Sequence, residues 1–141
     1  MTMAGKGYIM SGGTPEAIWN VLTDRIGDDL RAVIRYGPTE SESKLRPDVR
    51  RRYSTDALRD LVDRTIVAQL GHRRAQQTVA AGDLTAVVRV FEDAWIVSCP
   101  DPADRKCGVL LSIDRDGDQT TMADLEWCLG YVEQEVVGAT T

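Results

Sequence analysis

The sequence predicts a single α+β domain in which helices flank an antiparallel sheet that includes a three-strand meander. Apolar residues recur at helical spacing in three segments, and they alternate or form β-branched runs in the others. The strand-like segments come in groups, without the regular strand–helix alternation that a parallel sheet requires. A length of 141 residues suits one domain with one core.

The first element is a short amphipathic helix that begins after Thr14. This residue is a candidate N-cap, and Pro15 takes the first helical position, where its missing N–H costs nothing. Gly27 is a suitable C-terminal stop. The apolar positions that recur at helical spacing between them are Ile18, Val21, Leu22 and Ile26.

The next two segments read as strands of unequal quality. "LRAVIRYGP", residues 30–38, alternates apolar and polar side chains before a Gly-Pro pair, which is typical of a half-buried strand. "TESESKLRPD", residues 39–48, has Leu45 as its only strongly apolar residue. Any strand in it is therefore short, lies at an edge of the sheet and ends at Pro47.

A long helix is predicted over residues 54–81. Ser54 is a candidate N-cap, Gly71 marks a bend or an end, and Gly82 closes the segment. "HRRAQQTVAAG" after the bend still favours helix through its Ala, Gln and Arg content. The apolar stripe expected to face the core consists of Leu58, Leu61, Val62, Ile66 and Leu70.

The following thirty residues change to strand character. "LTAVVRVF", "AWIVSC" and "CGVLLSI" are β-branched runs separated by Glu92-Asp93 and by "PDPADRK", which predicts a meander. A turn cluster, "DRDGDQT", precedes Thr121 and Asp124, a variant of the capping box. The final helix carries the stripe Met122, Leu125, Leu129, Val132 and Val136, and the predicted order is α-β-(β)-α-β-β-β-α.

The chain ends are expected to lie outside the domain, which spans residues 14–137. Residues 1–13 are Gly-rich and read as a flexible leader or a cloning remnant, and residues 138–141 as a tail. The leader lacks the apolar run of a secretory signal, and no run of about 18 apolar residues could span a membrane. We therefore expect a cytoplasmic protein without a membrane partner.

The charges are unusual in kind. Asp outnumbers Glu 15 to 7 and Arg outnumbers Lys 14 to 3, with a net charge of −5. This pattern suits a halophilic protein, and the composition of a GC-rich genome would also produce it. Residues 1–80 carry a net charge of +3 and residues 81–141 of −8. Such a split marks a partner surface or orients self-association, unless it reflects only two differently solvated faces.

Two stretches of this sequence resemble a family of small uncharacterised haloarchaeal proteins. They are "LTAVVRVFEDAWIVSCP…GVLLSID" and "LRPDVRRRYSTDALRDLVD", and the resemblance extends over residues 30–136. The family brings no known catalytic residues. The element order also resembles the roadblock/longin-like fold, which includes the dynein light-chain-like proteins. That resemblance implies homodimers that pair through the long helix and an edge strand, and scaffold or small-GTPase-regulating roles.

The cysteines and the single histidine do not suggest a metal site. Cys99 and Cys107 are separated by seven residues, Cys128 lies within the last helix, and His72 is the only histidine. A closed zinc site needs four ligands at short spacings. Cys99 and Cys107 flank a hairpin loop, so a regulatory disulfide is an alternative to free thiols that pack as small hydrophobes. We expect no metal and no cofactor.

No catalytic set can be assembled from the remaining motifs. "AGKG" is not a P-loop, and no G-x-G-x-x-G follows a strand. "DRDGDQ" starts like a calcium loop with Asp114 and Asp116, but Gly117 comes too early and no Glu stands at the twelfth position. An acidic turn is the simpler interpretation. The protein is therefore predicted not to be an enzyme.

Two groups of residues are candidates for interaction. The first is basic and could neutralise phosphates, although a solvated or ion-paired face is the alternative. It consists of Arg50, Arg51 and Arg52 near Arg46 and Tyr53, with Arg73 and Arg74 farther along. The second is Trp127 and Tyr131, which helical spacing places opposite the core stripe of the last helix. Exposed aromatic pairs mark interfaces, unless the helix at 14–26 covers them.

These observations predict a non-enzymatic cytosolic interaction or scaffold module that forms homodimers. Its binding surface would be the sheet, the aromatic pair or the basic segment. A small GTPase is the protein partner that the roadblock resemblance implies. The alternative is a nucleic-acid-associated regulator that uses Arg50, Arg51 and Arg52.

Overall fold

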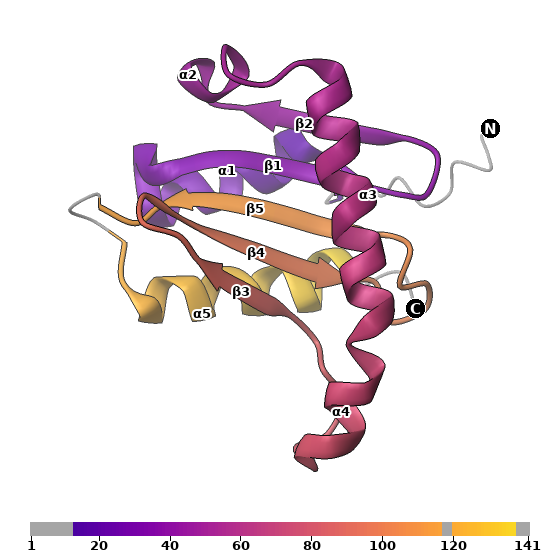
Figure 1. Cartoon of the computed structure of the whole chain (residues 1–141). Helices are drawn as coiled ribbons and strands as arrows, with labels where there is room; N and C mark the ends of the chain where they lie inside the picture. The colour runs from indigo at the N-terminus through magenta and orange to yellow at the C-terminus, as the bar shows by residue number, and fades with distance from the viewer. Residues whose placement is uncertain (1–12, 117–119, 138–141) are drawn as a thin grey trace.

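The computed structural model describes residues 13–116 and 120–137. Five antiparallel strands form one sheet in the order β2-β1-β5-β4-β3, with helices on both faces (Figure 1). The α+β class and the predicted order of elements are confirmed, and both are consistent with a roadblock/longin-like fold. The strands are β1 (Leu30–Tyr36), β2 (Ser41–Leu45), β3 (Val87–Val90), β4 (Ala94–Pro100) and β5 (Gly108–Asp114). The helices are α1 (Pro15–Ile26), α2 (Pro47–Arg50), α3 (Thr55–Gly71), α4 (Arg73–Val79) and α5 (Met122–Tyr131).

The three main helices begin where their caps predict. The Thr14 hydroxyl accepts a hydrogen bond from the backbone N–H of Ala17 at 3.1 Å, and Ser54 caps α3 in the same way. Thr121 and Asp124 form a reciprocal capping box at the start of α5. These side chains satisfy backbone donors that the first helical turn leaves without partners.

The two faces of the sheet are covered unequally. Helices α1 and α5 lie on one face, where they enclose the main core, and α3 crosses the other face alone (Figure 1). The main core includes Ile18, Leu22, Val33, Leu111 and Leu125. Beneath α3, the fully enclosed cluster is much smaller and consists of Ile34, Tyr36, Val62 and Leu110. The α3 face therefore buries less apolar surface than the face covered by α1 and α5.

The helical segment predicted over residues 54–81 forms two helices, and the break between them falls at Gly71, where a bend or an end was expected. Helix α3 ends at Gly71, α4 begins at Arg73, and Ala80 ends α4 in the left-handed conformation with φ of 55°. Leu70 was expected in the core but is 53% exposed. The preceding residue, Gln69, takes the inward position in the last turn of α3, where it is buried and its side-chain amide donates to the Tyr36 hydroxyl of β1.

Three further boundaries differ from the prediction or lie beyond what the structure describes. Strand β3 covers only Val87–Val90, although the apolar run extends over residues 84–91. Pro47 ends β2 as expected, but it also starts the short helix α2, since proline suits the first helical position. The leader up to residue 12, the tail at 138–141 and Gly117 lie outside the described residues.

Candidate interaction surfaces

Trp127 and Tyr131 lie side by side on α5 and form a nearly parallel pair. Their ring centroids are 6.2 Å apart and their planes differ by 7°. Trp127 is 38% exposed, as its helical position predicts, whereas Tyr131 is half-buried and packs against the main core. Helix α1 covers the pair in part, because the Arg25 guanidinium carbon lies 5.0 Å from the centre of the Trp127 ring.

Acidic side chains surround this aromatic pair. The Arg25 guanidinium donates to the Asp124 carboxylate at 3.0 Å, and backbone donation from Thr121 together with Arg25 lowers the pKa of Asp124. Burial and the nearby Glu135 carboxylate raise the pKa of the Tyr131 hydroxyl. Residues 121–141 contain four acidic residues and no basic one. The outer side of α5 is thus both aromatic and negatively charged.

A second candidate interface consists of exposed apolar side chains on α3 and on the edge strand β3, the kinds of element through which the fold resemblance implies pairing. Val67 is 70% exposed on α3, near the exposed Leu70. On the β3 side, Val90 and Phe91 are exposed, with Phe91 at 53%. Among the described residues, β3 is the last strand in the sheet order, so one side of its backbone has no neighbouring strand there. Among the residues of α3, the sequence signal for this surface was Val67, an apolar residue outside the core-facing stripe of its helix.

The basic segment is divided by the structure. Arg50, Arg51 and Arg52 are exposed between α2 and α3, next to the exposed Tyr53. Arg73 and Arg74 begin α4, and their side chains lie outside the described residues. The 17 residues of α3 separate the two groups by about 25 Å at a rise of about 1.5 Å per residue. They therefore do not form one patch.

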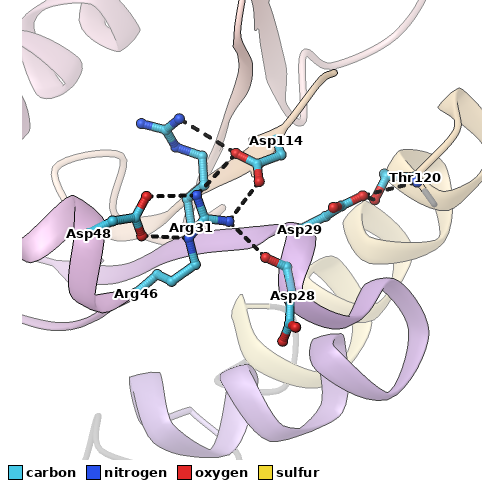
Figure 2. Close-up of polar contacts among 7 residues, drawn as sticks. All are labelled: Asp28, Asp29, Arg31, Arg46, Asp48, Asp114 and Thr120. Carbon is cyan, nitrogen blue, oxygen red and sulfur yellow. Dashed lines mark hydrogen bonds and ion pairs between the residues drawn. The ribbon is translucent and has the colours of Figure 1, made fainter. Parts of the chain in front are cut away.

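Arg46 is not part of the exposed basic segment, because three acceptors hold it in an ion-pair network (Figure 2). Its guanidinium donates to Asp48 at 2.6 Å, to Asp114 at 2.6 Å and to the Asp28 carbonyl at 2.7 Å. Arg31 lies 3.6 Å from Asp114. The hydrogen bond from Arg46 holds the pKa of Asp48 well below its usual range. This network joins α2, the turn after α1 and the end of β5.

Asp114 and its neighbours therefore have structural partners. The carboxylate that resembled a calcium-loop ligand is neutralised by two arginines at the end of β5. Asp29, in the turn after α1, is buried and accepts hydrogen bonds from the backbone N–H and the hydroxyl of Thr120 (Figure 2). Among the described residues, no group of three or more His, Cys, Asp or Glu is placed to hold a metal ion.

The three cysteines are free thiols. Cys99 pairs with Val109 across β4 and β5, so Cys107 is a diagonal neighbour two residues away, at about 7–8 Å between Cα atoms. A disulfide needs a shorter separation or a backbone movement. Burial raises the pKa of Cys99 to about 12 and that of Cys128 to about 11. Both therefore stay protonated near neutral pH and behave as small apolar side chains.

A cavity of about 520 Å³ opens where the β1–β2 turn meets the β4–β5 loop. Its lining includes Arg35, Glu42, Asp101 and Cys107. Burial and the carboxylates of Asp104 and Asp101 raise the pKa of the Cys107 thiol. The Cys107 thiol thus lies near carboxylates, which favour its protonated form over the nucleophilic thiolate.

None of the described helices is long and apolar enough to cross a membrane.

Comparisons with known proteins give a family without a described activity. A search of curated proteins found no match to this sequence. The sequence model of one family matches residues 16–133, which is most of the chain. The protein therefore belongs to the family described as "Domain of unknown function (DUF7522)".

Proposed function

We propose that the protein is a non-enzymatic interaction module that forms homodimers through β3 and α3. The observations that carry this proposal are the open edge of β3, where Val90 and Phe91 are exposed, and the exposed Val67 and Leu70 on α3. The occupant is a second copy of the chain. A two-fold axis beside β3 would pair two such strands antiparallel and extend the sheet from five strands to ten.

The side chains of β3 favour pairing over protection. Edge strands are commonly shielded by lysines, prolines or bulges, because their free N–H and C=O groups otherwise recruit another strand. The four residues of β3 contain three valines and one arginine. Val90 and the following Phe91 expose more than half of their surface. Covering these side chains would contribute about 25 cal/mol per Å² of apolar area removed from water.

Helix α3 supplies the second half of the proposed interface. Val67 and Leu70 are three residues apart and lie near each other on its surface. The charged side of the helix is already satisfied internally, since Arg59 pairs with Asp63 and Arg64 with Asp60. The apolar positions are thus the part of α3 that gains most from a partner. The roadblock/longin-like resemblance, with its pairing through a long helix and an edge strand, supports the same surface.

Light scattering at tens of micromolar protein tests the proposal, in both low and high salt. A homodimer has twice the 15.6 kDa mass of one chain. Leu70→Asp would place a charge in the interface and give the monomer mass. Met122→Asp is the matched control, because Met122 is also an exposed apolar residue but lies on α5. A wild-type protein that stays monomeric in both salts would refute the dimer.

The proposal extends to the setting in which the module acts. We place the module in the cytoplasm. A small GTPase is the partner class that the fold resemblance supports. Titration of the purified protein with small GTPases in the GDP and GTP states, read by interferometry, tests this extension separately from dimer formation.

A nucleic-acid-associated role is the second candidate, and the exposure of Arg50, Arg51 and Arg52 beside Tyr53 favours it. The test is an electrophoretic shift of DNA or RNA at low salt. Replacement of the three arginines by Ala should abolish the shift, whereas Arg64→Ala, which removes an exposed arginine from α3, should leave most of it. Absence of any shift for the wild type would eliminate this candidate.

A further inference from the structure

Trp127 and Tyr131 form a platform on α5, the helix that lies on the face of the sheet opposite α3 (Figure 1). The rings are nearly parallel, and more than a third of the Trp127 surface is open to solvent. The platform already binds one cation, because the Arg25 guanidinium lies over the Trp127 ring. The structure therefore contains an internal example of the contact that this platform makes with arginine.

The charges around the platform are unfavourable for the isolated chain. Helix α5 continues into a π-helical turn, Val132–Val137, that carries Glu133 and Glu135 and no basic residue. Carboxylates at the C-terminal end of a helix oppose the helix dipole, and like charges on neighbouring turns repel one another. A positively charged partner would offset both costs, whereas a phosphate backbone would add to them.

Gly130 leaves room beside the two rings. A Cβ atom added at this position would meet nothing within 4 Å, so the fold does not require a glycine there. Glycine inside a helix costs about 0.5–1 kcal/mol relative to alanine. Because Gly130 has no side chain, no atoms project from the helix at this position between Trp127 and Tyr131 in the sequence, and another chain has room to approach the rings there.

We propose that this α5 face binds an arginine-rich segment of a partner protein. One arginine of the partner stacks on the open surface of Trp127 and Tyr131, and others pair with the carboxylates of Glu126 and Glu135. Charge complementarity selects the occupant, since residues 121–141 hold four acidic residues and no basic one. This inference rests on the proposed role as an interaction module, but it does not depend on dimer formation because α3 and β3 lie elsewhere.

Fluorescence anisotropy with a labelled oligo-arginine peptide tests the site, with an oligo-glutamate peptide as the negative probe. Trp127→Leu keeps an apolar side chain but removes the aromatic face, and we expect about three- to tenfold weaker binding. Glu126→Gln with Glu135→Gln should weaken binding by a similar factor. The matched control is Glu42→Gln with Glu92→Gln, which removes the same charge from other exposed positions.

Three results would overturn the inference. They are no binding of oligo-arginine at low salt, equal losses in the two double variants, and no loss for Trp127→Leu. Circular dichroism shows whether each variant is folded. If the Trp127→Leu variant does not fold, the comparison of the two double Glu→Gln variants decides the test. Peptide binding by the monomeric Leu70→Asp variant separates the two proposals. If this monomer still binds the peptide, the α5 site is supported whatever the outcome for the dimer. If the wild type dimerises but does not bind the peptide, the α5 site is refuted and the dimer proposal stands.

Discussion

Gly108→Ala is expected to destabilise the fold strongly, because the start of β5 has no room for a side chain. Gly108 pairs with Tyr36 on one side and with Pro100 on the other. A Cβ atom there would lie 2.5 Å from the Cys99 carbonyl oxygen, 2.6 Å from the Tyr36 hydroxyl and 2.9 Å from the Pro100 Cα. Two of these three atoms belong to the β4 backbone, which cannot move without breaking the β4–β5 ladder.

The magnitude follows from two effects. Overpacking of a closed site costs about 1–3 kcal/mol. Displacement of Tyr36 would also break its buried hydrogen bond with Gln69, 2.6 Å long, at about 1–3 kcal/mol. The expected total is about 3 kcal/mol, a large part of the usual stability of a domain. With a slope of about 2 kcal/mol per molar urea, the unfolding midpoint should fall by about 1.5 M.

Urea unfolding followed by circular dichroism measures this loss. The matched control is Gly130→Ala, where the new methyl group meets nothing within 4 Å and the helix gains about 0.5–1 kcal/mol. The two substitutions are chemically identical and should shift the midpoint in opposite directions. A Gly108→Ala protein that unfolds at the wild-type urea concentration would refute the packing argument.

Three further predictions concern ionisation, backbone strain and the ion-pair network. Burial raises the pKa of Cys99 to about 12 and that of Cys128 to about 11, so the stability that their neutral thiols contribute is complete below about pH 9 and is lost as the pH rises toward those values. The urea midpoint should therefore be lower near pH 10 than near pH 7. Equal midpoints at the two pH values would contradict this prediction. Ala80→Gly should raise the melting temperature, since a left-handed φ of 55° costs a non-glycine residue about 1 kcal/mol, and a lower melting temperature would disprove the strain. Arg46→Met should lower the free energy of unfolding, measured with urea, by about 2 kcal/mol. This is less than the loss expected for breaking a fully buried ion pair, because the Arg46 side chain is 23% exposed. A loss near zero would show that the network contributes nothing to stability.

Much of the fold could be predicted because its signals are local. The caps at Thr14, Ser54 and Thr121 act within three residues of themselves, and each begins a helix where expected. Strand character in the meander came from side-chain type and period, which depend on near neighbours. The prediction failed for Leu70, whose helical spacing matched the core stripe although the buried positions of α3 are Val62, Thr65 and Gln69. Apolar periodicity could not show that a polar residue, Gln69, would face the sheet and bond to Tyr36.

The candidate sites depended more on distant contacts. Trp127 could be placed on the outer side of its helix from spacing alone, but Arg25, which covers part of its ring, comes from α1 at the other end of the chain. The fold resemblance implied pairing through a long helix and an edge strand, but only the sheet order identifies β3 as an edge strand. The apolar run of β3 does not distinguish it from a central strand, whereas the polar character of β2 did predict an edge.

The sequence by itself determined where the three main helices begin, the α+β class and the acidic character of the C-terminal third, since propensity, capping and composition are properties of short segments. Only the tertiary structure decided which charges are neutralised and which apolar side chains stay exposed. Arg46 looked like a member of an exposed basic run, yet it pairs with Asp114, 68 residues away. That contact exists because α2 and the end of β5 are brought together by the pairing of β2, β1 and β5, and long-range pairing of this kind is not encoded in any one segment.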